Sequence, residues 1–289
     1  MGEARLSPGR QGNRSLVVCA DDFGRDVAVN KAVEEAHRDG ILTVASLMVG
    51  APAAADAIAL AKRLPGLGVG LHLVLADGAP VLPPAELPVL VGADGTFDED
   101  MVRAGFRFYF SPAARRQLAA EIRAQFAAFA ATGLPLDHVN GHKHVHLHPT
   151  VARLVVEIGR DYGMRAMRLP WEPAAPLRRA APGERHRAPA WSPVVTSLRR
   201  RLDRAGLARN DQVFGLAWSG AMTEDRLLAL LPHLPGGVSE IYGHPASGAA
   251  SFAPGYRHAE ELAALVSPRV RQLVEALGLR LVRYADLTR

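Results

Sequence analysis

The sequence predicts an α/β fold: an irregular (β/α) barrel of the TIM type, formed by residues 15–289 as a single domain. Short apolar runs alternate with longer helical segments along most of the chain, which is typical of parallel strands joined by right-handed crossovers. Several runs are apolar throughout, as strands buried on both faces tend to be. The length of 289 residues is common for one α/β barrel. An open doubly wound sheet is the alternative arrangement.

The apolar runs predict up to eight strands. They are residues 15–20, 43–49, 68–74, 136–140, 166–169, 212–216, 239–242 and 280–283. The helices expected between them are residues 27–38, 53–63, 112–131, 150–162, 223–231 and 258–277. Capping residues support these limits, since Gly40 follows the first helix and Ser111 with Pro112 opens the third.

Two stretches interrupt the alternation, residues 76–110 and the Pro- and Arg-rich residues 170–205. Both are expected to be long insertions in βα loops, which lie on the face where barrel active sites form. Residues 1–14 are polar and are expected to form a disordered tail.

Composition narrows the class of protein. The single cysteine, Cys19, rules out an internal disulfide, which fits a reducing compartment. No apolar run approaches the ~18–20 residues that span a bilayer, so we expect a cytoplasmic protein. The net charge is +5, yet residues 178–204 alone hold eight arginines against two acidic residues. The rest of the chain is close to neutral, so we expect no nucleic-acid partner.

The first candidate site residues lie in LVVCADDFG, residues 16–24. An apolar strand runs directly into Asp21 and Asp22, at the expected carboxyl end of a parallel strand. Because side chains alternate along a strand, the two carboxylates point in different directions. One can therefore hold a metal while the other accepts a proton. The alternative is that Asp22 caps the next helix or shapes a turn.

Two further strand ends complete a candidate metal site. GVGLHLVL places His72 near the end of one strand, and HVNGHKHVHLH places His142 just past another, beside Gly141. Two imidazoles and a carboxylate, here that of Asp22, are a common ligand set for a catalytic divalent ion. A metal-free cluster of hydrogen-bonded histidines is the alternative. His146 is the next candidate, either as a ligand or as a neighbour of the ligands.

Other polar residues follow the remaining strands. SEIYGHP places His244 where it could act as a general acid, although a turn residue is the alternative. RLPWEP places Arg168 at a strand end, where a guanidinium can orient a carboxylate. Substrate contacts are expected from His144, His146, Glu240 and Trp218. A core position suits Trp218 equally well.

The segments ADDFG, SLMV, GLHL, NGHKHVHLHP and EIYGHP, in this order, resemble the YdjC-like carbohydrate deacetylases. These are relatives of the polysaccharide deacetylases and have an irregular (β/α) barrel. ASLMVGAPAAADA, LPGLGVGLHLVLADG and LDHVNGHKHVHLHPTVARL look closer still to the HpnK-type branch, which is associated with hopanoid biosynthesis. That branch is associated with removal of acetyl from an N-acetylglucosaminyl hopanoid, a sugar-headed lipid.

The resemblance implies a role for each matching residue. The ligands of one divalent metal ion, Zn²⁺ or Mg²⁺, would be Asp22, His72 and His142. Asp21 would be the base that takes a proton from the attacking water, and His244 would protonate the departing amine. Apart from the resemblance, Arg168 at its strand end could hold Asp21 ionised and oriented. Two positions depart from the family pattern. The histidine run begins Gly-His where the family has Ser-His, and Ala246 stands where glycine is frequent, which leaves the shape of that loop open.

The implied function is metal-dependent N-deacetylation of an N-acetylglucosamine-type sugar, as an oligosaccharide or as the headgroup of a hopanoid lipid. A metal-dependent phosphoesterase and a non-catalytic metal or sugar-lipid binding protein are the alternatives. For a membrane substrate, the arginines of residues 178–204 suggest peripheral contact with an anionic inner membrane. WSPVVTSLRRRLDRAGL, residues 191–207, resembles an interfacial amphipathic helix. A solvated basic helix and a homodimer contact are the other interpretations.

Overall fold

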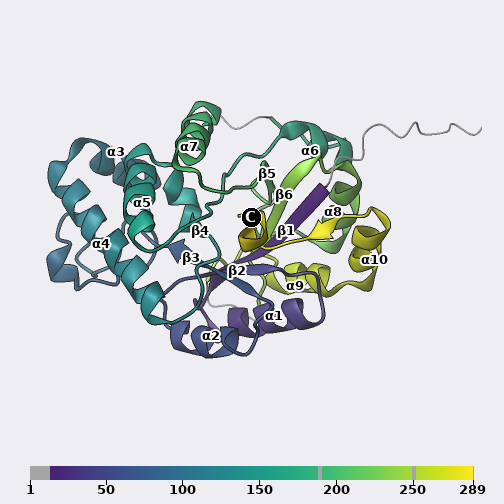
Figure 1. Cartoon of the computed structure of the whole chain (residues 1–289), viewed down its shortest axis with the longest axis horizontal. Coiled ribbons are helices and arrows are strands. Elements are labelled where there is room, and N and C mark those ends of the chain that lie inside the picture. Colours follow the sequence, from purple (N-terminus) through teal and green to yellow (C-terminus); the bar gives the residue numbers. More distant parts are fainter. Residues whose placement is uncertain (1–13, 188–190, 249–251, 289) are drawn as a thin grey trace, which may run out of the picture.

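A parallel sheet forms the centre of the molecule (Figure 1). The computed structural model describes residues 14–187, 191–248 and 252–288. The sheet has the order β4-β3-β2-β1-β6-β5, and β7 pairs with the beginning of β1. The strands are β1 (Arg14–Phe23), β2 (Val44–Leu47), β3 (Gly68–Leu73), β4 (Val139–Gly141), β5 (Gln212–Phe214), β6 (Gly237–Gly243) and β7 (Arg280–Leu281).

The sheet curls into an irregular, TIM-like half-barrel, which confirms the predicted fold class and single domain. Residues 165–171 continue it beyond β4, since Met167 bridges Val139 and Ala166 bridges Ala208. The strand expected at 166–169 is therefore reduced to isolated bridges. The reason lies in its neighbours: Pro170 has no N–H to donate, and the side chain of Asn210 binds both the N–H and the C=O of Leu169.

Helices surround the sheet, with α3, α4 and α5 on one side of the molecule and α8, α9 and α10 on the opposite side (Figure 1). The helices are α1 (Val27–Arg38), α2 (Ala54–Ala61), α3 (Met101–Phe110), α4 (Pro112–Ala131), α5 (Pro149–Asp161), α6 (Ala174–Ala180), α7 (Ser192–Ala205), α8 (Glu224–Leu230), α9 (His258–Val266) and α10 (Pro268–Ala276). The Oγ of Ser111 caps α4, as expected. The single helix expected over 258–277 is wrong: Ser267 ends α9 and caps α10, because Pro268 cannot continue the hydrogen bonds of α9.

Strand β1 is buried on both faces and carries Asp21 and Asp22 near its carboxyl end. Leu16 and Val18 pack between the sheet and the helices, whereas Val17 and Cys19 point to the inner side with Val213. All these side chains are fully buried. Because side chains alternate along a strand, Asp21 follows Cys19 on the inner side, and the Cys19 thiol lies 3.4 Å from its carboxylate.

Both predicted insertions leave the barrel as long βα connections, and both contain helices. Residues 76–110 include α3 and are held by Glu121 of α4, whose carboxylate accepts the N–H groups of Val81 and Leu82 at 2.8 and 3.0 Å. Residues 170–205 include α6 and α7, and residues 188–190 of this insertion lie outside the described residues. The predicted tail, residues 1–14, lies outside the described residues except for Arg14, which begins β1.

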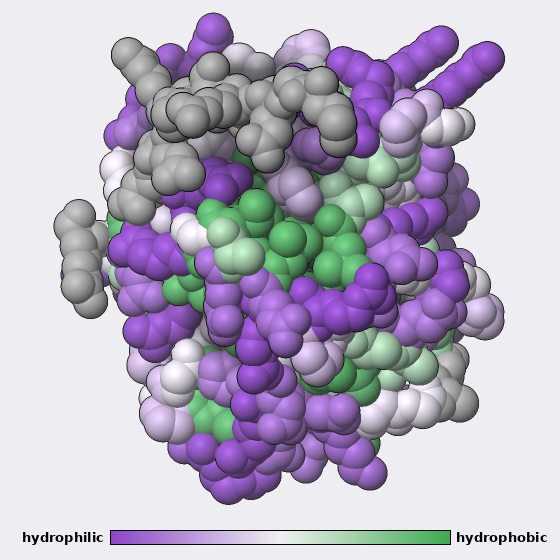
Figure 2. Space-filling model, turned by 90° about the vertical axis from the view of Figure 1, so that its right-hand side faces the viewer, coloured by the Kyte–Doolittle hydropathy of each residue, from purple (hydrophilic) through white to green (hydrophobic). Residues whose placement is uncertain are grey.

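Helix α7 does not have the exposed apolar face of an interfacial helix. Val195, Leu198 and Leu202 are buried against the domain, and Trp191 beside the helix is 46% exposed. The structure therefore favours the alternative of a basic helix, of which Arg200 and Arg204 are exposed to solvent. One face of the molecule is mostly hydrophilic with a hydrophobic area near its centre (Figure 2). Within the described ranges, none of the helices combines the length and the apolar character needed to cross a bilayer.

Candidate active site

The carboxyl ends of β1, β3, β4 and β6 meet at a pocket of about 650 Å³. Six of the predicted site residues line it: Asp21, Asp22, His72, His142, His144 and His244. Other side chains of the wall come from loops and from the first insertion, and they include Arg25, Asp77, Glu99, Lys143, Ser219 and Tyr256. The predicted strand ends are thus brought together from distant parts of the sequence.

Backbone strain is concentrated at this pocket. Five residues other than glycine have positive φ in the described part of the chain: Asp22, Asp77, Lys143, His144 and Ala253. All five line the pocket. A left-handed conformation is costly for residues with a Cβ and is typical of functional sites. At Asp22, with φ 63°, it coincides with a register shift in the pairing of β1 with β2, and this irregularity separates the directions of Asp21 and Asp22.

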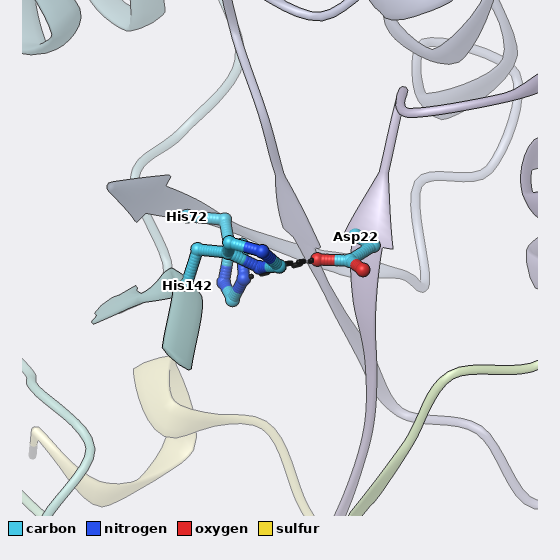
Figure 3. Close-up of side chains that lie close together, drawn as sticks. All are labelled: Asp22, His72 and His142. Carbon is cyan, nitrogen blue, oxygen red and sulfur yellow. Dashed lines mark hydrogen bonds and ion pairs between the residues drawn. The ribbon is translucent and has the colours of Figure 1, made fainter. Parts of the chain in front are cut away.

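Asp22, His72 and His142 form the predicted metal-ligand group (Figure 3). The Oδ1 of Asp22 lies 3.0 Å from Nδ1 of His142 and 3.3 Å from Nε2 of His72. One ligand atom from each residue lies within 4.8 Å of the others, and all three side chains are buried. A buried carboxylate is stable only beside positive charge, and a cation bound between the carboxylate and the imidazoles would supply it. Two nitrogens and one oxygen suit Zn²⁺ and leave a coordination position open, so these residues fit the expected divalent ion.

Three charged residues that sequence reasoning missed surround His142. Arg25 lies 3.2 Å from Asp22 and 3.4 Å from His142, and Asp77 lies 3.5 Å from His142. Lys143 pairs with Asp77 at 2.8 Å. Arg25 directly follows ADDFG, and Asp77 closely follows the third expected strand. These positions next to strand ends could have indicated that both residues belong to the site. Burial lowers the pKa of His142, but attraction to Asp22 and hydrogen bonds with Asp22 and Asp77 raise it to about 9.

Asp21 forms the second centre of the site. Arg168 donates to both of its oxygens, at 2.6 and 2.9 Å, and to Glu240 at 2.7 and 3.0 Å. All three side chains are buried, and Arg168 and Glu240 are completely inaccessible. Burial raises the pKa of Asp21, but the charge of Arg168 and its hydrogen bonds hold that pKa below the usual range. Asp21 is therefore ionised at neutral pH.

Glu240 and Trp218, both expected to bind substrate, lie away from the pocket wall. Glu240 lies beneath the site and accepts hydrogen bonds from Arg168 and from Tyr284. Trp218 is 4% exposed and donates to Glu184 at 2.7 Å, as its alternative core placement anticipated. Periodicity alone could not separate these roles, because a strand end has residues on both faces.

The three histidines that follow β4 and β6 differ in accessibility. His144 lines the pocket, with its Nε2 3.1 Å from the hydroxyl of Tyr242. His146 is completely buried outside the pocket wall, and burial lowers its pKa to about 3, so it is a neutral side chain behind the site. His244 lines the pocket, and its backbone is held by Glu261 and His258. This fixes the loop and presents the imidazole to the pocket.

Comparison with known proteins identifies the family. The family model described as YdjC-like protein matches residues 15–276. The chain belongs to the YdjC-like family. A carbohydrate deacetylase of Geobacillus stearothermophilus is 32% identical over 278 residues, covering 94% of this chain and 98% of the relative. A carbohydrate deacetylase of Brevibacillus brevis is 41% identical over 156 residues, which cover 54% of this chain and only 59% of that relative.

Solved structures support the fold of this YdjC-like protein. A protein of Enterococcus faecalis V583, described as a proposed cellobiose-phosphate cleavage protein, has a TM-score of 0.76 at 23% identity and covers 96% of this chain and 100% of its own. A lactam utilization protein of Thermus thermophilus has a TM-score of 0.51 at 15% identity, covering 92% of this chain and 98% of its own. At these identities the likeness concerns the fold alone.

Proposed function

We propose that this YdjC-like protein is a metal-dependent N-deacetylase of acetylated amino sugars. One observation carries the proposal: a buried Asp-His-His group, an ionised carboxylate and an accessible histidine line the same pocket. The carbohydrate deacetylase relatives support the choice of a sugar substrate. Hydrolysis of an acetamide needs an activated water and an acid for the departing amine, and the pocket has a residue for each task.

The residues divide the reaction between two sides of the pocket. An ion held by Asp22, His72 and His142 would supply Lewis-acid chemistry, activating water and polarising a carbonyl. Asp21 accepts the proton of the attacking water. Because the pKa of Asp21 is low, Asp21 is a weak base. The attacking water must therefore be made more acidic before Asp21 can take its proton.

Arg168 keeps Asp21 ionised and holds both of its oxygens in place. His244 donates a proton to the amine, because an amine leaves poorly as an anion. Tyr256 packs against the His244 ring at 5.1 Å between ring centres, which limits its rotation. His144 is placed to contact the sugar from the pocket wall.

Acetate release from N-acetylglucosamine oligosaccharides tests the proposal. Asp22→Ala and His142→Ala should abolish both metal binding and acetate release, whereas Asp21→Asn and His244→Gln should keep the metal and lose turnover. His233→Ala, a histidine outside the pocket wall, is the matched control and should remain active. Full activity of His142→Ala would refute the site assignment. A fully active Asp21→Asn would remove Asp21 as the base.

Metal stoichiometry separates this function from phosphoester hydrolysis, which often uses two ions. The ranges that the structure describes contain one group of three residues able to hold a metal, which favours the single ion of a deacetylase. Two ions per chain together with phosphoester cleavage would favour the alternative. Metal or sugar-lipid binding without any turnover would favour a binding protein.

The hopanoid headgroup is the more specific form of the proposal. It rests on the resemblance of three segments to the HpnK-type branch, and no residue of the pocket indicates a triterpenoid. Parallel assays with an N-acetylglucosaminyl lipid and with soluble chitooligosaccharides separate the two substrates. Preference for the soluble substrate would remove the hopanoid and leave the deacetylase in place.

The proposal includes a cytoplasmic location, since a chain with a single cysteine needs no oxidising compartment to form disulfides. Contact with an anionic membrane would depend on charge, because the apolar side of α7 is buried and Arg200 and Arg204 lie outside that buried side. Flotation with anionic vesicles at low salt should then be lost at high salt, and no binding in either condition would refute membrane contact.

A homodimer would bury an apolar surface, and Phe106 and Phe110 of α3 are 63% and 69% exposed. Light scattering measures the oligomeric state directly.

A further inference from the structure

Asn140, at the end of β4, lies between the two centres of the site. Its Oδ1 lies 2.6 Å from Nδ1 of His72, and its Nδ2 lies 3.1 Å from Oδ1 of Asp21 and 2.8 Å from Oγ of Ser46. All four side chains are buried. Asn140 therefore contacts a candidate metal ligand with one end of its amide and the candidate base with the other. The function proposed above does not use this residue.

The charge of Asp21 determines which way this amide points. A carboxylate paired with a guanidinium only accepts hydrogen bonds, and Arg168 donates to both oxygens of Asp21 at 2.6 and 2.9 Å. The NH₂ group of Asn140 must therefore face Asp21, which leaves its carbonyl oxygen facing His72. A carbonyl oxygen also only accepts, so Nδ1 of His72 carries the proton. Nε2, the ring atom 3.3 Å from Asp22, is then the nitrogen left to bind a metal ion.

A second chain of hydrogen bonds supports the same orientation from behind. Nδ1 of His138 lies 2.9 Å from the carboxylate of Asp137, and Nε2 of His138 lies 3.0 Å from Oγ of Ser46. With the proton on Nδ1, Nε2 of His138 accepts the hydroxyl proton of Ser46. The Ser46 oxygen then accepts from the NH₂ group of Asn140. Each donor along this chain meets an acceptor, so reversing the amide would disrupt two hydrogen bonds at once.

The packing around His138 shows that this chain is built into the fold. A Cβ at Gly70 would lie 2.5 Å from the His138 ring, so the strand next to β4 has room for this imidazole only because position 70 is glycine. Tyr284 stacks on the other side of the ring with 4.8 Å between ring centres. The backbone N–H of Ala285 donates to Asp137 at 2.9 Å. The C-terminal residues thus hold His138 and Asp137 in position.

We infer that Asn140 is a positioning residue that fixes the tautomer of His72. Ser46, supported by His138 and Asp137, holds its amide in the required orientation. Because Asn140 accepts the Nδ1 proton in a hydrogen bond, Nε2 beside Asp22 is the nitrogen left for a metal ion, and the same amide orients Asp21. A ligand whose tautomer is fixed in advance binds metal more tightly, and loss of such partners typically costs 10–100-fold in affinity. The inference rests on the metal site of the proposed function, but its test requires no substrate.

Nitrogen NMR of the histidine rings in the metal-free protein at pH 8 tests the inference. His72 should carry a proton on Nδ1, hydrogen-bonded to Asn140. In Asn140→Leu, which removes both ends of the amide at similar volume, His72 should show a mixture of both tautomers. Zn²⁺ titration should show affinity reduced about 10–100-fold in this variant. An unprotonated Nδ1 in the wild type would overturn the inference, as would wild-type tautomer and affinity in Asn140→Leu.

Ser46→Ala keeps the test decisive if Asn140→Leu does not fold. It removes one hydroxyl and should weaken Zn²⁺ binding through the orientation of Asn140. Ser239→Ala is the matched control, since Ser239 is a buried serine on β6 with a hydrogen bond to Gln212 and lies outside the pocket wall. Equal Zn²⁺ affinity in the two serine variants would overturn the inference. If the wild type binds no metal, the proposed function fails, while the tautomer of His72 is still read independently.

Discussion

Replacement of Arg168 by methionine would remove the cation that lies between two buried carboxylates of the described structure. Its guanidinium donates to Asp21 at 2.6 and 2.9 Å and to Glu240 at 2.7 and 3.0 Å, and none of its surface is exposed. Methionine has a similar length and fills much of the volume without charge. The variant therefore isolates the loss of charge from the loss of packing.

The expected cost follows from the geometry. Removal of one partner from a buried ion pair typically costs about 3–5 kcal/mol, which is a large part of a stability of about 5–15 kcal/mol. In the wild type the pKa of Asp21 is held low, so the pair stabilises the fold above the unfolded pKa of about 3.9 and loses this effect as the pH falls. In Arg168→Met the charge that chiefly opposes burial is lost, with only His72 and His244 still lowering the pKa of Asp21, so that pKa rises. The destabilisation should therefore be largest at neutral pH and smaller at low pH.

Urea unfolding at pH 7.5 and pH 4.5 measures this difference. Arg209→Met is the matched control, because Arg209 pairs with the half-exposed carboxylates of Asp203 and Asp211 in the described structure. Its cost should be about 0–1 kcal/mol at both pH values. An equal loss of stability at the two pH values in Arg168→Met would refute the reasoning, because lost packing would then explain the cost.

Three other predictions concern the site and its support. Metal binding at pH 7.5 should release about one proton, because the pKa of His142 is about 9 and a metal ligand must be deprotonated. Calorimetry in buffers of different ionisation enthalpy measures the number of protons released. No proton release would contradict the raised pKa. Glu121→Ala should lower the free energy of unfolding by about 1–3 kcal/mol and speed amide hydrogen exchange at residues 81–82, because their N–H groups lose their acceptor. Unchanged exchange at these two residues would contradict the role of Glu121. Gly70→Ala should lower the free energy of unfolding in urea by about 1–3 kcal/mol, because the added Cβ would overlap the buried ring of His138. Gly236→Ala is the control and should be close to neutral, since its Cβ would meet no atom within 4 Å. Equal stabilities of the two variants would contradict the overlap.

The parts of the site that the sequence predicted are those at the ends of strands. Asp22, His72 and His142 each follow an apolar run, and parallel strands bring their carboxyl ends to one edge. The roles of Glu240 and Trp218 were harder to predict. A residue next to a strand end faces either the pocket or the interior, and the turn of the barrel wall decides which. Both face the interior here.

Helix α7 shows the same limit on a larger scale. Its pattern of apolar and basic residues is amphipathic, and the sequence does not say whether a lipid surface or the protein covers the apolar side. The structure places Val195, Leu198 and Leu202 against the domain. The break between α9 and α10 was indicated in the sequence, because Pro268 cannot donate the hydrogen bond that a continuous helix requires.

The sequence by itself determined the barrel class, the family and the three candidate ligands, because these depend on local periodicity and on residues at strand ends. Only the tertiary structure decided how the polar side chains are connected by hydrogen bonds. Asn140, Ser46 and Asp21 are separated by many residues, and hydrogen bonds of 2.8 and 3.1 Å between them form only when their strands lie in one sheet. Hydrogen bonds act over a few ångströms, so a partner that is distant in the sequence is defined by the fold.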